Sequence, residues 1–398
     1  MSQATHDDRR YEAHGVTRRE VSRPISADTP SRTGVELRKA DIAFGARRGL
    51  RGIDLRVGAG ERTALLGPSG VGKTSILRAI AGLDPLLDGE VLVNGVDVSH
   101  TAPERRSVVY LHQTPTLFPH LSVQNNIGFP MEVRGATRRD ARRRVDALLT
   151  RVRMTEFASR MPASLSGGQR HRVALARALA AEPTVLLLDE PFAALDPALR
   201  ADVRDAVFAM LDDVSGPAVI MVTHDIDEAA ALADSIAILL DGAVVQHATP
   251  AIVLTRPTSL AVARFLGLPN IVYGVVDGAG AFVSDVGVFD ARCAAGPAAL
   301  VSRADAVRVV MPANHTSRVD GDRAEGEPAV VRSGVVRSVQ QRLGGALVRV
   351  QVGAHNLSAT IRHNDSPSVG DVVAVHIDPA RVHVVSLDAA DTTAHCRV

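Results

Sequence analysis

The sequence has little of several residue types, and each shortage narrows the interpretation. Its 398 residues include no Trp, only two Cys and 3% aromatic residues. Two cysteines, Cys293 and Cys396, are too few for a disulfide framework, which favours a reducing compartment. No apolar run approaches the roughly 18 residues that a membrane-spanning helix needs. Residues 1–15 contain no apolar segment, so we expect no secretion signal there.

An excess of charge of either sign is also missing. The chain carries 45 basic and 44 acidic residues, a formal net charge of +1. It therefore has no bulk electrostatic attraction to nucleic acid or anionic lipid, and we expect no nucleic-acid partner. The basic residues are almost all Arg, because Lys occurs only at Lys39 and Lys73. We attribute Lys39 to chance, whereas Lys73 lies in a motif that needs a compact ammonium group.

What is present is the composition of a soluble globular chain, with 46% apolar and 22% charged residues. The length indicates two or three domains. Residues 1–33 mix charge, Ser, Thr and Pro without periodicity, and we predict a disordered extension. Residues 34–267 alternate apolar strands with helical patterns, which predicts a largely parallel α/β core. Residues 268–398 hold short β-type runs and Gly turns, which predict an all-β domain with a polar segment at 313–327 between two lobes.

Several elements can be placed within these regions. The runs TALLG (63–67), TVLLLD (184–189) and AVIMVTH (218–224) are continuously apolar, as in central strands buried on both faces. The Arg-rich pattern of residues 138–153 predicts an amphipathic helix whose charges form a solvated face. In ALVRVQVG (346–353) the apolar residues alternate with polar ones, as in a half-buried strand after a Gly-Gly hairpin turn.

The strongest local signal is GPSGVGKT, which follows an apolar strand and precedes the helical pattern SILRAIAGL. Triphosphate oxygens need several backbone N–H groups at once, and glycines let the backbone approach closely. Lys73 would supply a point charge to the β- and γ-phosphates, and the Thr74 hydroxyl would bind Mg²⁺. The predicted phosphate contacts are Gly67, Pro68, Ser69, Gly70, Val71, Gly72, Lys73, Thr74 and Ser75.

A second signal is the pair of carboxylates that ends TVLLLDEP. At the carboxyl end of a parallel strand, Asp189 would lie beside the phosphate loop and help to hold Mg²⁺. Glu190 would activate the attacking water. Adjacent carboxylates repel each other, so a nearby cation is the natural compensation.

The segment LSGGQ, residues 165–169, completes a resemblance to the nucleotide-binding subunit of an ATP-binding-cassette (ABC) transporter. Phosphate-loop ATPases in general lack this signature. It stands before the helical pattern GQRHRVALARALAAEP, so hydroxyl and amide donors would lie at a helix N-terminus. The resemblance implies ATP contacts from Ser166, Gly167, Gly168 and Gln169.

The resemblance assigns further roles one residue at a time. Gln113 matches the glutamine that senses Mg²⁺ and faces the transmembrane partner, and His224 matches the histidine that contacts the γ-phosphate. Asp196 matches the aspartate that crosses the dimer interface, and Phe44 the aromatic residue that stacks on adenine. The implied catalytic residues are Glu190, His224, Gln113 and Lys73, and the implied metal ligands are Thr74, Gln113 and Asp189.

Two histidines depart from the family pattern. His112 replaces the aromatic residue that usually precedes the glutamine corresponding to Gln113, and His171 stands where the family often has Gln. Both lie outside the predicted ATP contacts. We therefore expect them to bear on subgroup and substrate and to leave the ATPase intact.

The resulting fold class is α/β: a phosphate-loop ABC cassette with a mixed, mainly parallel sheet and a helical subdomain, followed by an all-β, OB-like domain. The resemblance implies a homodimer in which ATP lies between residues 67–74 of one copy and 166–169 of the other. It also implies separate permease subunits, an indirectly coupled extracytoplasmic binding protein, and work at the cytoplasmic face of the inner membrane. ATP and Mg²⁺ are the expected cofactors.

The cargo and some alternatives stay open at this point. The segments FAALDPALR and NIGFPMEVRG favour an importer of ferric iron, polyamines or oxyanions over a sugar importer. A soluble ABC ATPase without a permease is one alternative, although such proteins usually carry two cassettes in one chain. A ligand-sensing protein dominated by its β lobes is another.

Overall fold

The structure is a computed structural model of the chain, and it describes residues 33–43, 49–114, 116–192, 216–311, 330–342, 344–362 and 367–387. The predicted polar segment at 313–327 lies outside the described residues. So does the predicted disordered extension, except for Thr33, which begins the first strand.

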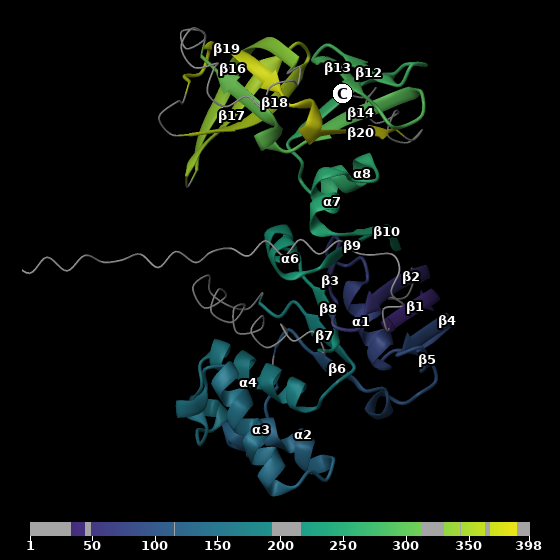
Figure 1. The fold of residues 1–398 in the computed structure, drawn as a ribbon, viewed down its shortest axis with the longest axis vertical. Helices are drawn as coiled ribbons and strands as arrows, with labels where there is room; N and C mark the ends of the chain where they lie inside the picture. The colour runs from purple at the N-terminus through teal and green to yellow at the C-terminus, as the bar shows by residue number, and fades with distance from the viewer. Residues whose placement is uncertain are drawn as a thin grey trace, which may run out of the picture. The chain divides into compact units, whose positions relative to one another are not determined.

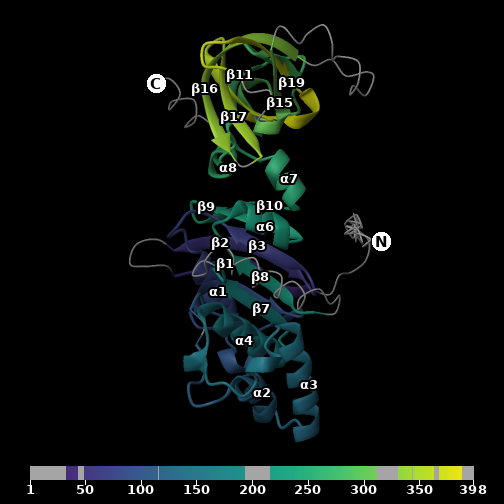
Figure 2. The same cartoon turned by 90° about the vertical axis from the view of Figure 1, so that its left-hand side faces the viewer.

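A six-stranded sheet forms the centre of the cassette, with its strands in the order β10-β9-β3-β8-β7-β6. Neighbouring strands are parallel except for β10, which runs antiparallel to β9 at the edge. Figure 2 shows β3, β8 and β7 side by side in this order. Every residue of β7 and β8 is buried, which confirms the central strands that the apolar runs predicted. The strands are β3 Arg62–Leu66, β6 Val108–Leu111, β7 Val185–Asp189, β8 Ala218–Val222, β9 Ser235–Leu240 and β10 Ala243–Ala248.

The first strands form a second sheet of the cassette, beside the mixed, mainly parallel sheet that the sequence predicted. The second sheet is antiparallel and has the order β2-β1-β4-β5. Along β2 buried and exposed residues nearly alternate, as expected where one face meets the core and the other meets water. The buried face shares a core cluster with residues of β3 and α1. The strands are β1 Thr33–Ile42, β2 Leu50–Gly58, β4 Leu86–Val93 and β5 Val96–Asp97.

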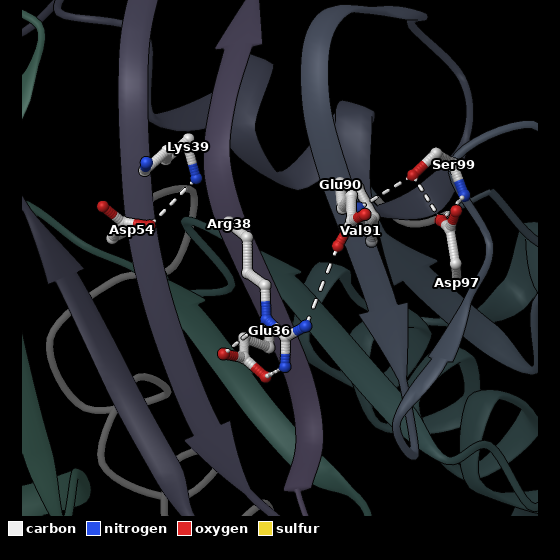
Figure 3. A network of polar contacts seen from close by, with 8 residues as sticks. All are labelled: Glu36, Arg38, Lys39, Asp54, Glu90, Val91, Asp97 and Ser99. Atoms are coloured by element: carbon white, nitrogen blue, oxygen red, sulfur yellow. Dashed lines mark hydrogen bonds and ion pairs between the residues drawn. The ribbon is translucent and has the colours of Figure 1, made fainter.

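The exposed face of this sheet carries a polar network around a β-bulge (Figure 3). The register of β1 shifts between Leu37 and Ala40, and Lys39 has a φ of 44° there. The backbone N–H of Lys39 donates to Asp54 over 2.9 Å. Arg38 binds Glu36 through two hydrogen bonds of 3.0 Å. Because these side chains face solvent, their ion pairs contribute little to stability.

The helices α2, α3 and α4 pack against one another as a helical subdomain (Figure 1). In α3 the apolar residues Ala141, Val145, Leu148 and Leu149 are buried while its arginines are exposed, which confirms the predicted amphipathic helix. Helix α1 instead belongs to the core beneath the two sheets. The helices are α1 Lys73–Ala81, α2 Val123–Val133, α3 Arg138–Arg151, α4 Gly167–Ala180, α6 Ile226–Leu232, α7 Pro250–Thr255 and α8 Leu260–Phe265. Short 3₁₀ turns span Pro103–Arg105, Thr155–Phe157, Pro162–Ser164, Ala304–Ala306 and Pro379–Arg381.

The C-terminal region contains two five-stranded antiparallel sheets, which confirms the predicted all-β character. Their inner faces share one apolar cluster. Val348 and Val350 are buried while Arg349 between them is exposed, and Gly344 turns the hairpin with a φ of 88°. One sheet has the order β13-β12-β11-β14-β20 and the other β15-β19-β16-β17-β18. The strands are β11 Asn270–Val276, β12 Ala281–Ser284, β13 Gly287–Asp290, β14 Gly296–Ser302, β15 Val307–Val310, β16 Val330–Arg342, β17 Gly345–Val352, β18 His355–Ile361, β19 Val372–Ile377 and β20 Val382–Ser386.

Helix α8 takes part in the packing of the β-rich region. Its Leu260 and Ala263 share a small apolar cluster with Ala299 and Val301 of β14 and Val385 of β20. Among the described residues, no helix is both long enough and apolar enough to cross a membrane.

Candidate functional site

The phosphate loop lies between β3 and α1, where the sequence predicted it. Lys73 is the first residue of α1 and is 7% exposed. Its ammonium group donates to the carbonyl oxygens of Gly67 over 2.7 Å and Pro68 over 2.9 Å. Burial lowers the pKa of Lys73, and the nearby carboxylates of Glu190 and Asp189 act against that shift. The ammonium therefore lies folded against its own loop, partnered by neutral oxygens.

Two glycines of the loop have no room for a side chain. Gly72 precedes α1 with a φ of 109°, and a Cβ there would lie 2.9 Å from the Leu50 side chain. A Cβ on Gly67 would lie 2.4 Å from the carbonyl oxygen of Leu239, which is backbone and cannot turn aside. The loop therefore needs glycine for its conformation as well as for the approach of a ligand.

Thr74 and Asp189 meet at the base of the loop. The Thr74 hydroxyl donates to Asp189 Oδ1 over 3.2 Å, although 115 residues separate the two in sequence. Asp189 ends β7 and is 8% exposed. Its other oxygen, Oδ2, accepts a hydrogen bond of 2.7 Å from the Tyr110 hydroxyl on β6. Burial, and next the bond to Asp189, raise the pKa of Tyr110, so the phenol stays protonated and remains a donor.

Glu190 follows Asp189 in the sequence and lies near two further predicted site residues, Gln113 and His224. Its backbone has a φ of 44°, a left-handed conformation that costs a non-glycine residue about 1–2 kcal/mol. The Gln113 side-chain amide donates to Glu190 Oε2 over 3.3 Å. His224 Nδ1 lies 3.9 Å from Glu190 Oε1, and the His224 side chain is 65% exposed. One oxygen of the Glu190 carboxylate therefore faces Gln113 and the other faces His224.

The signature segment forms the start of α4. The Ser166 hydroxyl accepts from the Gln169 N–H over 3.3 Å, and the Gln169 side-chain oxygen accepts from the Ser166 N–H over 2.9 Å. This reciprocal capping box leaves Ser166 and Gly167 exposed at the helix N-terminus. Across the described residues, no hydrogen bond or ion pair joins residues 166–169 to residues 67–74.

Two of the predicted site residues, Phe44 and Asp196, lie outside the described residues. The sequence does not single out one further residue that contacts the candidate site, Tyr110. Tyr110 is in register with Leu187 on the neighbouring parallel strand, which brings its hydroxyl to Asp189. The aromatic residue three positions before Gln113 was the available signal, but it reads as an ordinary strand residue until the pairing of β6 with β7 is known.

The donor set at Thr74 and Asp189 fits Mg²⁺. The Thr74 hydroxyl oxygen and a carboxylate oxygen of Asp189 lie 3.2 Å apart, and Mg²⁺ prefers such hard oxygen ligands. The residues described contain no group of three or more His, Cys, Asp or Glu arranged to hold a metal ion. A site with few protein ligands suits Mg²⁺ that arrives with a nucleotide, because phosphates and waters then supply the remaining ligands.

Comparison with known proteins agrees with this site. A family model described as ABC transporter matches residues 50–193. The sulfate/thiosulfate import ATP-binding protein of Methylococcus capsulatus is 43% identical over 255 residues, which are 63% of this chain and 73% of that protein. The spermidine/putrescine import ATP-binding protein of Nitrosomonas europaea is 40% identical over 237 residues, 60% of this chain and 65% of that protein.

Another match extends through the β-rich region. The sulfate/thiosulfate import ATP-binding protein of Burkholderia pseudomallei is 37% identical over 364 residues, 90% of this chain and 95% of that protein. A dimeric post-hydrolysis structure of the ATP-binding cassette MJ0796 with ADP and Pi aligns with a TM-score of 0.48 and 30% identity, over 54% of this chain and 98% of that one. The chain thus belongs to the ABC transporter family, as an ATP-hydrolysing subunit of the bacterial importer type.

Proposed function

We propose that the residues between β3, β7 and β8 bind Mg²⁺-ATP and hydrolyse it, in a site that a second copy of the chain completes. One observation carries this proposal. The phosphate loop, the carboxylates of Asp189 and Glu190, and His224 all follow the carboxyl ends of adjacent parallel strands, although they are spread over 158 positions from 67 to 224. Ligands of open α/β sheets bind at this edge.

Lys73 is proposed to bind the β- and γ-phosphates. It presently donates to two carbonyl oxygens of its own loop, which are weaker partners than phosphate oxygens. Burial penalises the Lys73 charge more than the nearby carboxylates of Glu190 and Asp189 compensate, so a bound polyanion would supply further compensation. The backbone amides of residues 69–75 and the N-terminus of α1 would receive the remaining phosphate oxygens.

Thr74 and Asp189 are proposed to hold Mg²⁺, with the Gln113 amide oxygen as a further ligand. When bound, the ion would neutralise charge on the β- and γ-phosphates. Tyr110 would orient the Asp189 carboxylate through its hydrogen bond, as partners behind a metal ligand commonly do.

Glu190 is the proposed general base. Its carboxylate would accept a proton from the water that attacks the γ-phosphate, and the Gln113 amide holds that carboxylate in place. His224 is exposed beside the same carboxylate and would donate to the γ-phosphate. The three side chains come from separate segments, so they form a catalytic arrangement only in the folded cassette.

The second copy would supply Ser166, Gly167, Gly168 and Gln169. Ser166 and Gly167 are exposed at the N-terminus of α4, which suits an anion. Among the described residues, no hydrogen bond or ion pair joins the four residues to the phosphate loop of their own chain. A head-to-tail pair of chains would bring each signature segment to the loop of the other chain. Asp196 would cross the same interface, and Phe44 would stack on adenine.

We further propose that the subunit works at the cytoplasmic face of the inner membrane, docked on separate permease subunits. The proposed docking region runs from Gln113 to Met131 and continues into α2, whose Phe129 and Val133 expose 37% and 70% of their surfaces. An extracytoplasmic binding protein would deliver the cargo to the permease. The C-terminal sheets would stabilise or regulate the dimer.

The cargo is proposed to be a small charged solute. The relatives named above import sulfate, thiosulfate, spermidine or putrescine, which differ in the sign of their charge. Because the permease and binding protein select the cargo, the cassette is compatible with an oxyanion or a polyamine. Uptake of labelled sulfate and labelled spermidine, compared between cells with the natural chain and cells with Lys73→Ala, distinguishes them.

The hydrolytic site itself is tested with Glu190→Gln, which keeps the shape of the side chain and removes its basicity. Binding of ATP should persist while turnover falls by about a hundredfold or more. Glu182→Gln is the matched control, because Glu182 also has a left-handed backbone, with a φ of 46°, but is exposed and paired with Arg144. Unchanged hydrolysis by Glu190→Gln would remove Glu190 from the role of base.

A further inference from the structure

His171 connects the signature helix to the segment that follows β6. The residue lies on the second turn of α4 and is 5% exposed. Its Nδ1 is 3.3 Å from the carbonyl oxygen of Gly167, one turn earlier in the same helix. Its Nε2 is 3.1 Å from the carbonyl oxygen of Gln113, 58 residues away in sequence. One buried ring therefore bridges the start of the signature helix and the residue that contacts Glu190.

The contact continues through Gln113 to the proposed base. The backbone carbonyl of Gln113 faces His171, and its side-chain amide donates to Glu190 over 3.3 Å. If the backbone at Gln113 shifts, the amide shifts with it, because side-chain direction follows the backbone. His171 thus lies two contacts from the carboxylate without touching it.

A second polar connection holds the same segment to α4. Arg177 donates to the carbonyl oxygen of Thr116 and to Asn126 Oδ1, the latter over 3.3 Å. Its guanidinium lies 4.8 Å from the centre of the Phe118 ring. Asn126 is fully buried and bonds in turn to the backbone of Phe118 and Leu121. Arg177 thus contacts the segment after β6 at Thr116 and Asn126, whereas His171 contacts it at Gln113.

The chemistry of the bridge requires a hydrogen-bond donor at position 171. Both ring nitrogens face carbonyl oxygens, which only accept. Burial lowers the pKa of His171, and the charge of Arg170 acts in the same direction, whereas the two carbonyl contacts oppose it. With a proton on Nε2, the ring donates to the Gln113 carbonyl oxygen and makes the bond between the two elements.

We propose that His171 is a positioning residue for hydrolysis: by donating to the Gln113 carbonyl it holds the Gln113 amide against Glu190. The inference rests on the roles proposed above for Gln113 and Glu190. Through this contact, the position of α4 would influence where the Glu190 carboxylate lies. A residue that only filled space beneath α4 would instead affect folding and leave the geometry of the base unchanged.

Two nearly isosteric replacements separate donation from packing. Gln and Met are both unbranched and similar in size, but only Gln can donate a hydrogen bond. We expect His171→Met to lower kcat on the order of tenfold or more, since small misplacements of reacting groups are costly, and His171→Gln to stay within about threefold of the natural chain. The KM for ATP and the melting temperature should differ little between the two variants, because they lose the same ring.

His247→Met is the matched control. His247 lies on β10 with its Nε2 3.0 Å from the Ser235 hydroxyl, and burial lowers its pKa as it does for His171. Its loss should leave kcat unchanged within about twofold, because distant sites act independently. Equal losses of kcat in His171→Gln and His171→Met would overturn the proposal, since donation would then make no difference.

A double-mutant cycle shows whether His171 acts through Gln113. Gln113→Ala should lower kcat by itself, and adding His171→Met should then change kcat by less than about twofold, because there is no amide left to position. Multiplicative losses would overturn the positioning role while leaving the proposed function in place. If Gln113→Ala hydrolyses ATP at the natural rate, the role proposed for Gln113 fails first, and the inference about His171 falls with it.

Discussion

The Tyr110 hydroxyl donates a hydrogen bond of 2.7 Å to the Asp189 carboxylate. The carboxylate proposed to hold Mg²⁺ is thus oriented by a side chain of the neighbouring strand. The two residues are 79 positions apart in sequence and meet because β6 and β7 are parallel and in register. Since Thr74 uses the other oxygen of Asp189, the carboxylate is fixed from two sides before any ion arrives. An ordered ligand of this kind binds an ion with less loss of conformational freedom.

Tyr110→Phe removes this hydrogen bond and little else. We expect the Mg²⁺ concentration for half-maximal ATP hydrolysis to rise about tenfold, because partners behind a metal ligand typically matter at that level. Stability should fall by about 1 kcal/mol, the usual contribution of one hydrogen bond. A Mg²⁺ titration of ATPase activity measures the first effect and thermal melting the second.

Tyr273→Phe is the control for that variant. The Tyr273 hydroxyl accepts from Arg264 over 3.0 Å, and Tyr273 belongs to β11 of the β-rich region. This change should leave the Mg²⁺ titration where it was. An equal shift in both variants would mean that Tyr110 has no particular connection to the metal site.

Acidification should destabilise the protein in a window set by buried histidines. Burial lowers the pKa of His171 and of His383, and at His383 the charge of Arg256 adds to the shift. As the pH falls below about 6.5, the unfolded chain takes up these protons before the folded chain does. The free energy of unfolding is therefore full above this value and decreases below it.

Thermal melting between pH 8 and 5 measures this effect. His171→Gln should flatten the decrease, because its side chain does not titrate. Carboxylates whose pKa is lowered, such as Asp84 beside Arg78, lose their contribution only below about pH 4, so they do not interfere. A melting temperature that rises from pH 7 to pH 5.5 would contradict the burial effect on the histidines.

Two complementary variants test the shared site. Lys73→Ala damages the phosphate loop, and Ser166→Arg blocks the signature segment. In a mixed dimer both lesions fall on one composite site, and the other site is intact. An equal mixture of two inactive proteins should then recover about a quarter of the natural activity, since half of the dimers are mixed and each has one good site. Full activity of either variant alone would contradict a shared site.

Much of this architecture follows from the sequence because its signals are local. Continuous apolar runs predict β7 and β8, and glycines with a Lys predict the phosphate loop, whose conformation leaves no room for other side chains at Gly67 and Gly72. These patterns depend on residues that are close together in the chain. The separate antiparallel sheet of β1, β2, β4 and β5 was not predicted, because alternation along a strand does not reveal which strand lies beside it.

The missed parts of the site depend on long-range pairing or on unusual backbone. Tyr110 reaches Asp189 only through the register of β6 with β7, and His171 reaches Gln113 only through the docking of α4. Nothing in its local sequence marks Glu190 for a left-handed backbone, which glycine or asparagine would normally occupy. His171 is expected to lie outside the ATP contacts, and in the structure it makes a contact to the Gln113 backbone that the resemblance did not imply.

ATP hydrolysis by this chain is proposed to need two copies, because residues 166–169 of one copy would complete the phosphate site formed by residues 67–74 of the other. The most direct test is the ATPase rate per chain as a function of protein concentration, with the monomer and dimer populations followed by sedimentation. If hydrolysis needs the dimer, the rate per chain falls toward zero as dilution removes it. A rate per chain that stays constant down to concentrations where only monomers sediment would contradict it.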